Sequence, residues 1–171
     1  MKGRRALVLG LGRSGAACAR VLDAEGWSVV VTDRAHAQAS LLLARTLPPA
    51  VEVHLDDDGL RAVEVADMIC PSPGVDWRSP VLERARARGL PVRSEIALAF
   101  ERCPAPIAGV TGTNGKTTTT ALLGAVLEAG GARVHVGGNI GATILDRLAG
   151  VHPDDWVVLE LSSFQLESTE R

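Results

Sequence analysis

A chain of 171 residues with 46% apolar and 22% charged side chains has the composition of a globular protein, which excludes a disordered or low-complexity chain. Its formal net charge of −2 provides no field that would attract nucleic acid or an anionic membrane surface. No apolar run reaches the roughly 20 residues of a membrane-spanning helix, and the amino terminus enters a strand without a cleavage signal. We therefore expect a cytoplasmic protein that neither binds nucleic acid nor inserts into a membrane.

The first ninety or so residues alternate between strand and helix patterns. We expect strands at residues 5–10, 27–32, 51–55, 67–70 and 90–93, and helices from about 16 to a stop at Gly26, at 35–47 and at 80–88. This alternation predicts a parallel sheet with helices on its faces. The acidic segment at 56–59 is interpreted as a solvated turn.

A glycine fingerprint, Gly10-Leu-Gly-Arg-Ser-Gly15, follows the first strand, and Asp33 ends the second. This pattern is typical of a dinucleotide-binding fold in which the acid binds a ribose hydroxyl. Ligands of such folds bind at the carboxyl ends of the strands, so residues 72–74 are expected on the same rim. Two simpler interpretations stay open: a glycine turn without a ligand, and Asp33 as a cap of the following helix.

A domain boundary is expected near Ser94, where the charge balance changes. Residues 1–94 carry 13 basic and 11 acidic side chains, a net of +2, whereas residues 95–171 carry 5 and 9, a net of −4. A helix at 95–102 should lead into strands at 107–110, 133–136 and 156–160, with helices at 116–129 and up to about 148. Three strands are few for a nucleotide-binding sheet, so we expect an amino-terminal fragment of a longer enzyme, without its carboxy-terminal domain.

The strongest motif is Thr111-Gly-Thr-Asn-Gly-Lys-Thr117, between a strand and a helix. Its glycines allow backbone N–H groups to turn toward a polyphosphate at the helix amino terminus. Its lysine would reach the β- and γ-phosphates, and the following threonine hydroxyl would bind Mg²⁺. The loop is shorter than the common pattern, because Val110 stands where that pattern has its first glycine. The predicted polyphosphate-binding residues, which the resemblance described below assigns to ATP, are Gly112, Thr113, Asn114, Gly115, Lys116, Thr117 and Thr118.

Further polar residues follow the later strands of the second segment. Glu160 ends an apolar strand, where an acid can hold Mg²⁺ directly or through water, or can simply face solvent. Asn139, between glycines, can bind a phosphate or substrate oxygen, or only stabilise a left-handed turn. Ser162 and Gln165 offer neutral hydrogen-bonding groups. The four histidines are scattered and interpreted as surface or loop residues, so none activates a serine nucleophile.

Three motifs together resemble the Mur ligase family of peptidoglycan synthesis: Val110–Thr118, Gly137–Gly141 and Glu160–Glu167, in this order. The phosphate loop alone is also shared with folylpolyglutamate synthases. The Glu-Leu-Ser-Ser-Phe-Gln-Leu run, together with the amino-terminal glycine fingerprint, is similar to the branch that adds D-glutamate to UDP-N-acetylmuramoyl-L-alanine. The resemblance extends over essentially the whole chain.

The resemblance implies an α/β protein with a Rossmann-like UDP-binding domain at 1–94, followed at 95–171 by the first part of a P-loop-type ATP-binding domain. It implies amide ligation through an acyl phosphate, with ATP and Mg²⁺, by a protein that is monomeric at full length and inactive as this fragment. Lys116 and Glu160 would be catalytic, and Thr117 and Glu160 would bind metal. The implied substrate-binding residues are Gly12, Arg13, Ser14, Asp33, Arg34, Gly74, Asn139, Ser162 and Gln165.

One position departs from the family pattern, because a threonine and an arginine usually follow the position of Asp33, whereas this chain has Arg34 and Ala35. Three alternative functions stay open. They are a related amino-acid ligase, including the folylpolyglutamate type, a NAD-binding oxidoreductase that uses the first glycine turn, and a nucleotide-binding module without catalysis.

Overall fold

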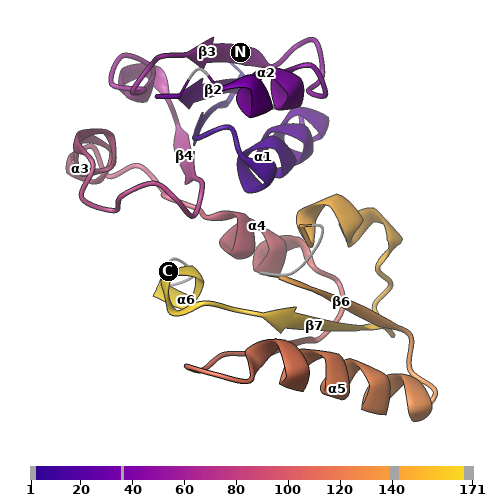
Figure 1. Cartoon of the computed structure of the whole chain (residues 1–171). Helices are drawn as coiled ribbons and strands as arrows, with labels where there is room; N and C mark the ends of the chain where they lie inside the picture. Colours follow the sequence, from indigo (N-terminus) through magenta and orange to yellow (C-terminus); the bar gives the residue numbers. More distant parts are fainter. Residues whose placement is uncertain (1–2, 36, 139–142, 168–171) are drawn as a thin grey trace. The chain divides into compact units, whose positions relative to one another are not determined.

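The computed structural model describes residues 3–35, 37–138 and 143–167 (Figure 1). The chain divides into two compact units, Met1–Glu95 and Ile96–Arg171, and the division lies one residue beyond the start of the second predicted domain. Each unit is described separately below. Within the described ranges, no helix combines the length and the apolar character needed to cross a membrane.

Unit 1 is a four-stranded parallel sheet with helices packed against it (Figure 1). The sheet order is β3-β2-β1-β4, and all three strand pairs are parallel, as the alternating pattern predicted. The elements in chain order are β1 (Arg5–Leu9), α1 (Arg13–Ala24), β2 (Ser28–Asp33), α2 (Gln38–Ala44), β3 (Glu52–Leu55), the 3₁₀ helix η1 (Ala62–Val65), β4 (Met68–Pro71) and α3 (Pro80–Ala87).

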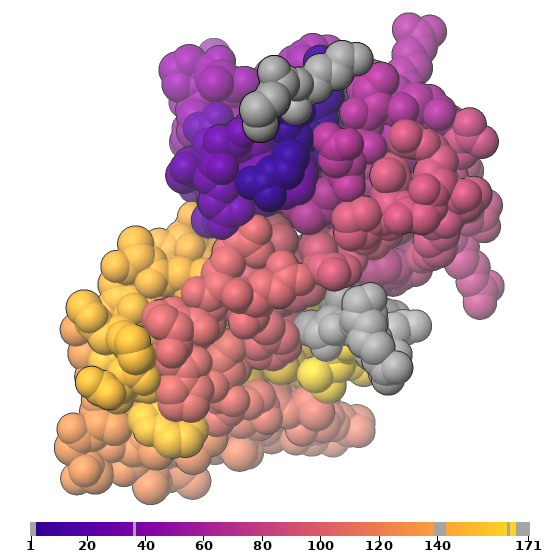
Figure 2. Space-filling view, turned by 180° about the vertical axis from the view of Figure 1, so that it is seen from behind, coloured from indigo at the N-terminus to yellow at the C-terminus, as the bar shows by residue number. Residues whose placement is uncertain are grey.

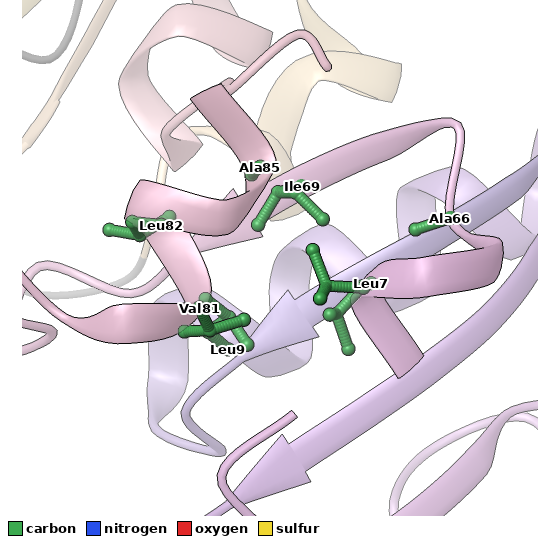
Figure 3. Close-up of a cluster of buried hydrophobic side chains, with 8 residues drawn as sticks. Leu7, Leu9, Ala66, Ile69, Val81, Leu82 and Ala85 are labelled. Atoms are coloured by element: carbon green, nitrogen blue, oxygen red, sulfur yellow. The ribbon is translucent and has the colours of Figure 1, made fainter. Parts of the chain in front are cut away.

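The core of unit 1 is built on β1, which is buried on both faces. Leu7 and Leu9 pack with Ile69 of β4, Leu82 of α3 and a set of smaller side chains from α3 and η1 (Figure 3). Side chains alternate along a strand, so Ala6 and Val8 point to the opposite face. A strand that is covered on both faces has a continuous run of apolar residues in the sequence. This explains why the sequence pattern predicted the position of β1 correctly.

Two predictions for unit 1 need correction, and one element was not predicted. Residues 90–93 form no strand, because only one isolated bridge joins Val92 to Ile69 before the chain enters the next helix. Helix α2 covers 38–44 rather than 35–47, since the backbone N–H of Ala35 donates instead to the Asp33 carboxylate. The 3₁₀ turn η1 was not predicted at all.

Unit 2 contains a three-stranded parallel sheet in the order β5-β7-β6. The elements are α4 (Glu95–Arg102), which begins at the boundary, β5 (Ile107–Val110), α5 (Lys116–Ala129), β6 (Val134–Gly138), the 3₁₀ helix η2 (Leu145–Gly150), β7 (Trp156–Glu160) and α6 (Ser163–Glu167). The helix predicted to end near Leu148 is therefore a 3₁₀ helix over its described part.

Helix α5 packs closely on the sheet of unit 2. A Cβ on Gly124 would lie 2.7 Å from Cγ2 of Val136 in β6, so this glycine permits the close approach. Helix α5 forms part of the molecular surface (Figure 2). Its Leu122 and Val126 side chains are more than half exposed, whereas Thr120 and Gly124 are buried. Close packing on one side fixes the position of the loop that precedes α5.

Candidate functional site

The glycine turn of unit 1 is held together by very close packing. A Cβ on Gly15 would lie 2.0 Å from the carbonyl oxygen of Gly10, so no larger residue fits there without a backbone shift. The Ser72 hydroxyl, at the end of β4, donates a hydrogen bond of 2.8 Å to the same Gly10 oxygen. Gly10 itself has a φ of +87°, a conformation that favours glycine. The turn therefore has a defined shape, fixed from two strands.

Asp33 lies beside this turn, and both of its carboxylate oxygens bind backbone N–H groups. Oδ2 accepts from Leu11 at 2.6 Å, and Oδ1 accepts from Ala35 at 2.8 Å. The carboxylate thus joins the end of β2 to the glycine turn. Each carboxylate oxygen has a second lone pair, so this structural role is compatible with a further contact to a ligand.

A cavity of about 600 Å³ opens over the carboxyl ends of these strands. This volume lies within the range of roughly 300–1,000 Å³ typical of small-molecule sites. Gly12 faces open space, because a Cβ there would meet no atom within 4 Å. All six residues predicted for the nucleotide of the substrate line this one cavity: Gly12, Arg13, Ser14, Asp33, Arg34 and Gly74.

Sequence reasoning missed other residues of the cavity lining. Asp57 and Asp58 accept the backbone N–H groups of Gly59 and Leu60, respectively, as expected for a turn, but both also line the cavity. Their position directly after β3 could have indicated this, since the carboxyl ends of parallel strands share one edge. Ser72, expected on this rim, also lines the cavity, and the lining residues outside the predicted set include Leu9, Thr32, Val75, Asp76, Ser79 and Val81.

The phosphate loop of unit 2 owes its shape to two glycines with positive φ. Gly112 has a φ of +146° and Gly115, at the N-cap of α5, has a φ of +76°. The Lys116 ammonium group donates to the carbonyl oxygen of Gly112 at 2.8 Å and contacts that of Thr113 at 3.4 Å. The loop therefore presents a lysine charge and a helix amino terminus at one place, which suits a polyphosphate.

The Thr117 hydroxyl donates a hydrogen bond of 2.7 Å to Oε2 of Glu160. Glu160 ends the central strand β7 and is only 4% exposed, opposite Val110 of β5 and Gly138 of β6 in the register. A hydroxyl and a carboxylate are the hard oxygen donors that Mg²⁺ prefers, and such sites use one or two carboxylates together with substrate phosphates. The two side chains thus fit a magnesium ion bound beside a phosphate.

The other predicted residues of unit 2 have different positions. Ser162 and Gln165 form a reciprocal capping box at α6, since Ser162 N–H donates to Gln165 Oε1 at 2.9 Å and Gln165 N–H donates to Ser162 Oγ at 3.2 Å. This gives both side chains a structural role close to Glu160. Thr113, Asn114 and Thr118 are exposed along the loop and the start of α5. Asn139 lies outside the described residues.

One histidine does not lie on the surface as expected. His135 belongs to β6, its side chain is 16% exposed, and its Nε2 lies 2.8 Å from Oδ2 of the buried Asp155. The same carboxylate oxygen accepts the backbone N–H of His152 at 2.9 Å. These two hydrogen bonds, the backbone bond first, and the charge of Arg133 lower the pKa of Asp155. The cluster lies around residues that precede β7, whereas Glu160 ends that strand, so it contributes to structure rather than to the phosphate site.

Comparison with known families gives two matches that together cover most of the chain. Residues 4–94 match the family described as "Mur ligase MurD-like, N-terminal domain", and residues 110–171 match "Mur ligase middle domain". A UDP-N-acetylmuramoylalanine--D-glutamate ligase of Koribacter versatilis is 44% identical over 100% of this chain and 38% of its own length. The enzyme of the same name from Thermosynechococcus vestitus is 45% identical over 95% of this chain and 37% of its own length. The chain thus spans less than two fifths of these relatives.

Solved structures support the same fold at lower sequence identity. UDP-N-acetylmuramate:L-alanyl-gamma-D-glutamyl-meso-diaminopimelate ligase from Neisseria meningitides matches 95% of this chain and 55% of its own, with a TM-score of 0.57 and 21% identity. UDP-N-acetylmuramate-alanine ligase MurC from Thermotoga maritima matches 93% of this chain and 37% of its own, with a TM-score of 0.53 and 22% identity. The predicted α/β class is confirmed, with a parallel-sheet, Rossmann-like first domain followed by part of a Mur ligase middle domain.

Proposed function

Because this chain belongs to the Mur ligase family, we propose that it forms the substrate-nucleotide unit and the phosphate loop of an ATP-dependent ligase. The reaction proposed is the addition of D-glutamate to UDP-N-acetylmuramoyl-L-alanine, in cytoplasmic synthesis of peptidoglycan precursors. The names of relatives that match the chain over almost all its length support this choice of substrates. Those relatives are more than twice as long, so the activity is proposed for the complete protein that carries these residues.

We assign the UDP part of the substrate to the cavity of unit 1. Gly12 leaves open space at the first turn of α1, where backbone N–H groups and the helix dipole favour a diphosphate. Arg13 and Arg34 add positive charge to the lining. Arg34 thereby places a cation next to Asp33 although the residue pair that the family usually carries is absent.

Unit 2 is proposed to hold ATP. In the first step an oxygen of the alanyl carboxylate attacks the γ-phosphorus, the bond to the bridging oxygen breaks, and ADP leaves with that electron pair. In the second step the amine of D-glutamate attacks the acyl phosphate, an amide forms, and inorganic phosphate and a proton leave. Lys116 acts electrostatically, because its fixed ammonium group stabilises negative charge on the transferred phosphoryl group.

A magnesium ion at Thr117 and Glu160 would supply further positive charge to the phosphates. The contribution of the chain is to hold two oxygen donors at one point beside the loop, since Glu160 is fixed by the central strand and Thr117 by the first turn of α5. Ser162 and Gln165 are proposed to support this edge through the capping box that follows Glu160. A direct contact of either with the substrate stays a prediction.

The observation that carries the proposal is the hydrogen bond between Thr117 and Glu160 next to Lys116. These two residues are 43 positions apart in the sequence, yet their side chains meet at 2.7 Å. A dehydrogenase built on the first glycine turn would leave this arrangement without a function. A binding module without catalysis would not need a buried acid at the phosphate loop.

The test is an amino-acid panel with the complete protein, measured as phosphate release from ATP in the presence of UDP-N-acetylmuramoyl-L-alanine. We expect phosphate release when D-glutamate is added, and none when L-alanine or a diaminopimelate is added in its place. A separate assay with a folate and L-glutamate as the two substrates should also give no phosphate release. Release that depends on another amino acid would replace the assigned substrate. Tight binding of NADH without any phosphate release would instead favour the oxidoreductase.

The polypeptide of 171 residues should behave differently. We expect it to bind UDP and Mg·ATP in separate titrations but to release no phosphate when all substrates are present. Clear turnover by this polypeptide would contradict the prediction that it is inactive alone.

A further inference from the structure

Strand β6 makes two very close contacts within unit 2, and a glycine permits each of them. One contact is with α5, where a Cβ on Gly124 would lie 2.7 Å from Cγ2 of Val136. The other is with β7, because Gly138 at the end of β6 is paired in register with Glu160. Strand β6 is thereby tied both to the helix that carries Thr117 and to the strand that ends in Glu160 (Figure 1).

Gly138 is required at its position for two reasons. Its φ is +101°, a conformation that favours glycine. A Cβ at this position would also lie 2.2 Å from the carbonyl oxygen of Glu160 and 2.9 Å from its backbone nitrogen. These are backbone atoms, which cannot rotate away as the end of a side chain can. An alanine at position 138 therefore has to separate β6 from the backbone of Glu160.

The face of α5 that packs on the sheet includes the threonine of the proposed magnesium site. Thr117, Thr120 and Gly124 are spaced by three and four residues, so they lie on one face of the helix. Thr120 and Gly124 are buried, and the Thr117 hydroxyl donates to Oε2 of Glu160 at 2.7 Å. Any movement of α5 relative to β7 therefore changes the spacing of the two oxygen donors.

An alanine at position 138 would change this spacing whichever strand moves. Strand β7 is held on its other side by β5, since the N–H of Leu161 donates to the carbonyl oxygen of Val110 at 2.9 Å. Strand β6 lies at an edge of the three-stranded sheet in the described part of unit 2, so we expect β6 to move and to displace α5 with it. If Glu160 moved instead, its carboxylate would leave Thr117 directly. Mg²⁺ requires near-ideal octahedral geometry, so it tolerates little change in the positions of its ligands.

We propose that the two glycine contacts of β6 position the magnesium ligands of unit 2. Gly138 sets the distance from β6 to Glu160, and Gly124 sets the distance from β6 to the helix that carries Thr117. Both glycines are thus positioning residues, because neither supplies an atom to the metal. This inference rests on the magnesium role proposed above for Thr117 and Glu160.

The test is calorimetric titration of the 171-residue chain with ATP, once with Mg²⁺ and once with EDTA. The ratio of the two dissociation constants gives the metal-dependent gain in ATP affinity. We expect Gly138→Ala to reduce this gain about tenfold, the equivalent of one weakened interaction with a charged group. The affinity for ATP in EDTA should stay unchanged, because Lys116 and the loop glycines are untouched.

Gly131→Ala is the matched control for backbone strain. Gly131 has a φ of +90°, but a Cβ there would meet no atom within 4 Å. Both glycine variants should lower the urea midpoint of unit 2, followed at Trp156, because alanine is strained at positive φ. Only Gly138→Ala should reduce the metal-dependent gain. An equal reduction in both variants, or a full gain in Gly138→Ala, would overturn the proposal.

Gly124→Ala tests the second contact and keeps the proposal testable should Gly138→Ala fail to fold. Alanine favours a helix more than glycine does, so a loss of intrinsic helix stability cannot explain its effect. We expect a smaller metal-dependent gain, because the new methyl group meets Cγ2 of Val136. Adding Val136→Ala removes that atom and should restore the gain, whereas Val136→Ala alone should leave it unchanged. A full gain in Gly124→Ala, or a loss that Val136→Ala does not restore, contradicts the positioning role of β6.

Glu160→Gln tests the proposed magnesium role separately. It removes the charge of the ligand without adding an atom to the backbone contact, and it should abolish most of the metal-dependent gain. If Glu160→Gln kept the gain, or if the unchanged chain had none, both the magnesium role and this inference would be wrong. If Glu160→Gln lost the gain while Gly138→Ala kept it, this inference alone would be wrong.

Discussion

The two strand–turn–helix segments, β1–α1 in unit 1 and β5–α5 in unit 2, use glycine for different reasons. In the first, Gly15 is required by packing, since a Cβ there would meet the Gly10 carbonyl oxygen at 2.0 Å. In the second, Gly112 and Gly115 are required by their positive φ, while a Cβ on either would meet nothing closer than 3.9 Å. The first turn is crowded by its own fold, and the second is open.

This difference fits two different tasks. The crowded turn is tied to neighbouring strands through Ser72 and Asp33, and the charge it presents is an arginine on an exposed helix turn. The open loop carries Lys116 over its carbonyl oxygens and is backed by the Thr117–Glu160 pair. A rigid turn with a neighbouring cavity suits binding of a nucleotide that does not react. An open loop with a lysine and a buried acid suits transfer of a phosphoryl group.

The largest expected effect therefore comes from the lysine of the open loop. Lys116→Ala in the complete protein should lower the rate of D-glutamate-dependent phosphate release by about 10³, the loss seen when one preorganised donor to a transition-state charge is removed. Its melting temperature should stay within a few degrees, because Lys116 contacts only carbonyl oxygens of its own loop in the described part of unit 2.

Arg13→Ala is the matched change in the crowded turn. It removes a cation near the proposed diphosphate and should raise the KM for the UDP substrate with a much smaller change in kcat. If Lys116→Ala altered only KM while Arg13→Ala abolished kcat, the assignment of binding to one turn and chemistry to the other would be reversed.

Much of this comparison was accessible from the sequence. The two glycine motifs, the strands before them and the helices after them were predicted close to their observed bounds, because buried parallel strands and glycine turns leave strong local patterns. The grouping of the substrate residues in unit 1 could be predicted from the parallel topology, which brings the carboxyl ends of the strands together, and all six predicted residues do line one cavity. Glu160 was placed next to the phosphate loop for the same reason, at the end of a strand.

What the sequence did not reveal depends on contacts between distant residues. Ser79 looks like an ordinary N-cap, and only the structure shows that its side chain does not cap the helix. Asp57 and Asp58 read as a solvated turn, and only the fold brings them to the cavity. Ser162 and Gln165 were predicted on the substrate, although their spacing of three residues is also that of a capping box. That signal was present in the sequence and was overlooked.

The second prediction tests the two reasons for glycine directly. Gly15→Ala should destabilise unit 1 by about 3 kcal/mol or more, because the new methyl group meets a backbone oxygen that cannot move alone. Gly115→Ala should destabilise unit 2 by about 1–2 kcal/mol, the cost of a left-handed conformation in an open site. Urea unfolding followed by the indole NMR signals of Trp27 in unit 1 and Trp156 in unit 2 separates the two effects.

Gly12→Ala serves as the control for the crowded turn. Its φ is −98° and the space around it is open, so the variant should lose only about 1 kcal/mol, the cost of alanine at an N-cap, and less than Gly15→Ala loses. Equal losses for Gly12→Ala and Gly15→Ala would show that backbone freedom, and not packing, explains the first turn.

The smallest expected difference between the units is in their response to acid. In unit 2 the buried Asp155 accepts the backbone N–H of His152 and a hydrogen bond from His135, and these contacts lower its pKa below the ordinary value of 3.8. A carboxyl with a lowered pKa in the folded state stabilises the fold above its unfolded pKa, and this contribution is lost as the pH falls through the lowered value. The lowered pKa of Glu64 in unit 1 comes from a pair with Arg84 in which both side chains are about half exposed, so it contributes little.

The urea midpoint of unfolding should therefore decrease between pH 6 and pH 3, and the decrease should be larger for unit 2, followed at Trp156, than for unit 1, followed at Trp27. Asp155→Asn should lower the urea midpoint followed at Trp156 at pH 6. It should also reduce the change of this midpoint between pH 6 and pH 3, because the variant has no carboxylate to protonate at this position. Asp154→Asn, at an exposed neighbouring acid, should leave that difference unchanged. If Asp155→Asn kept the full difference, the acid sensitivity of unit 2 would not come from Asp155, and the structural role assigned to its hydrogen bonds with His135 and His152 would be wrong.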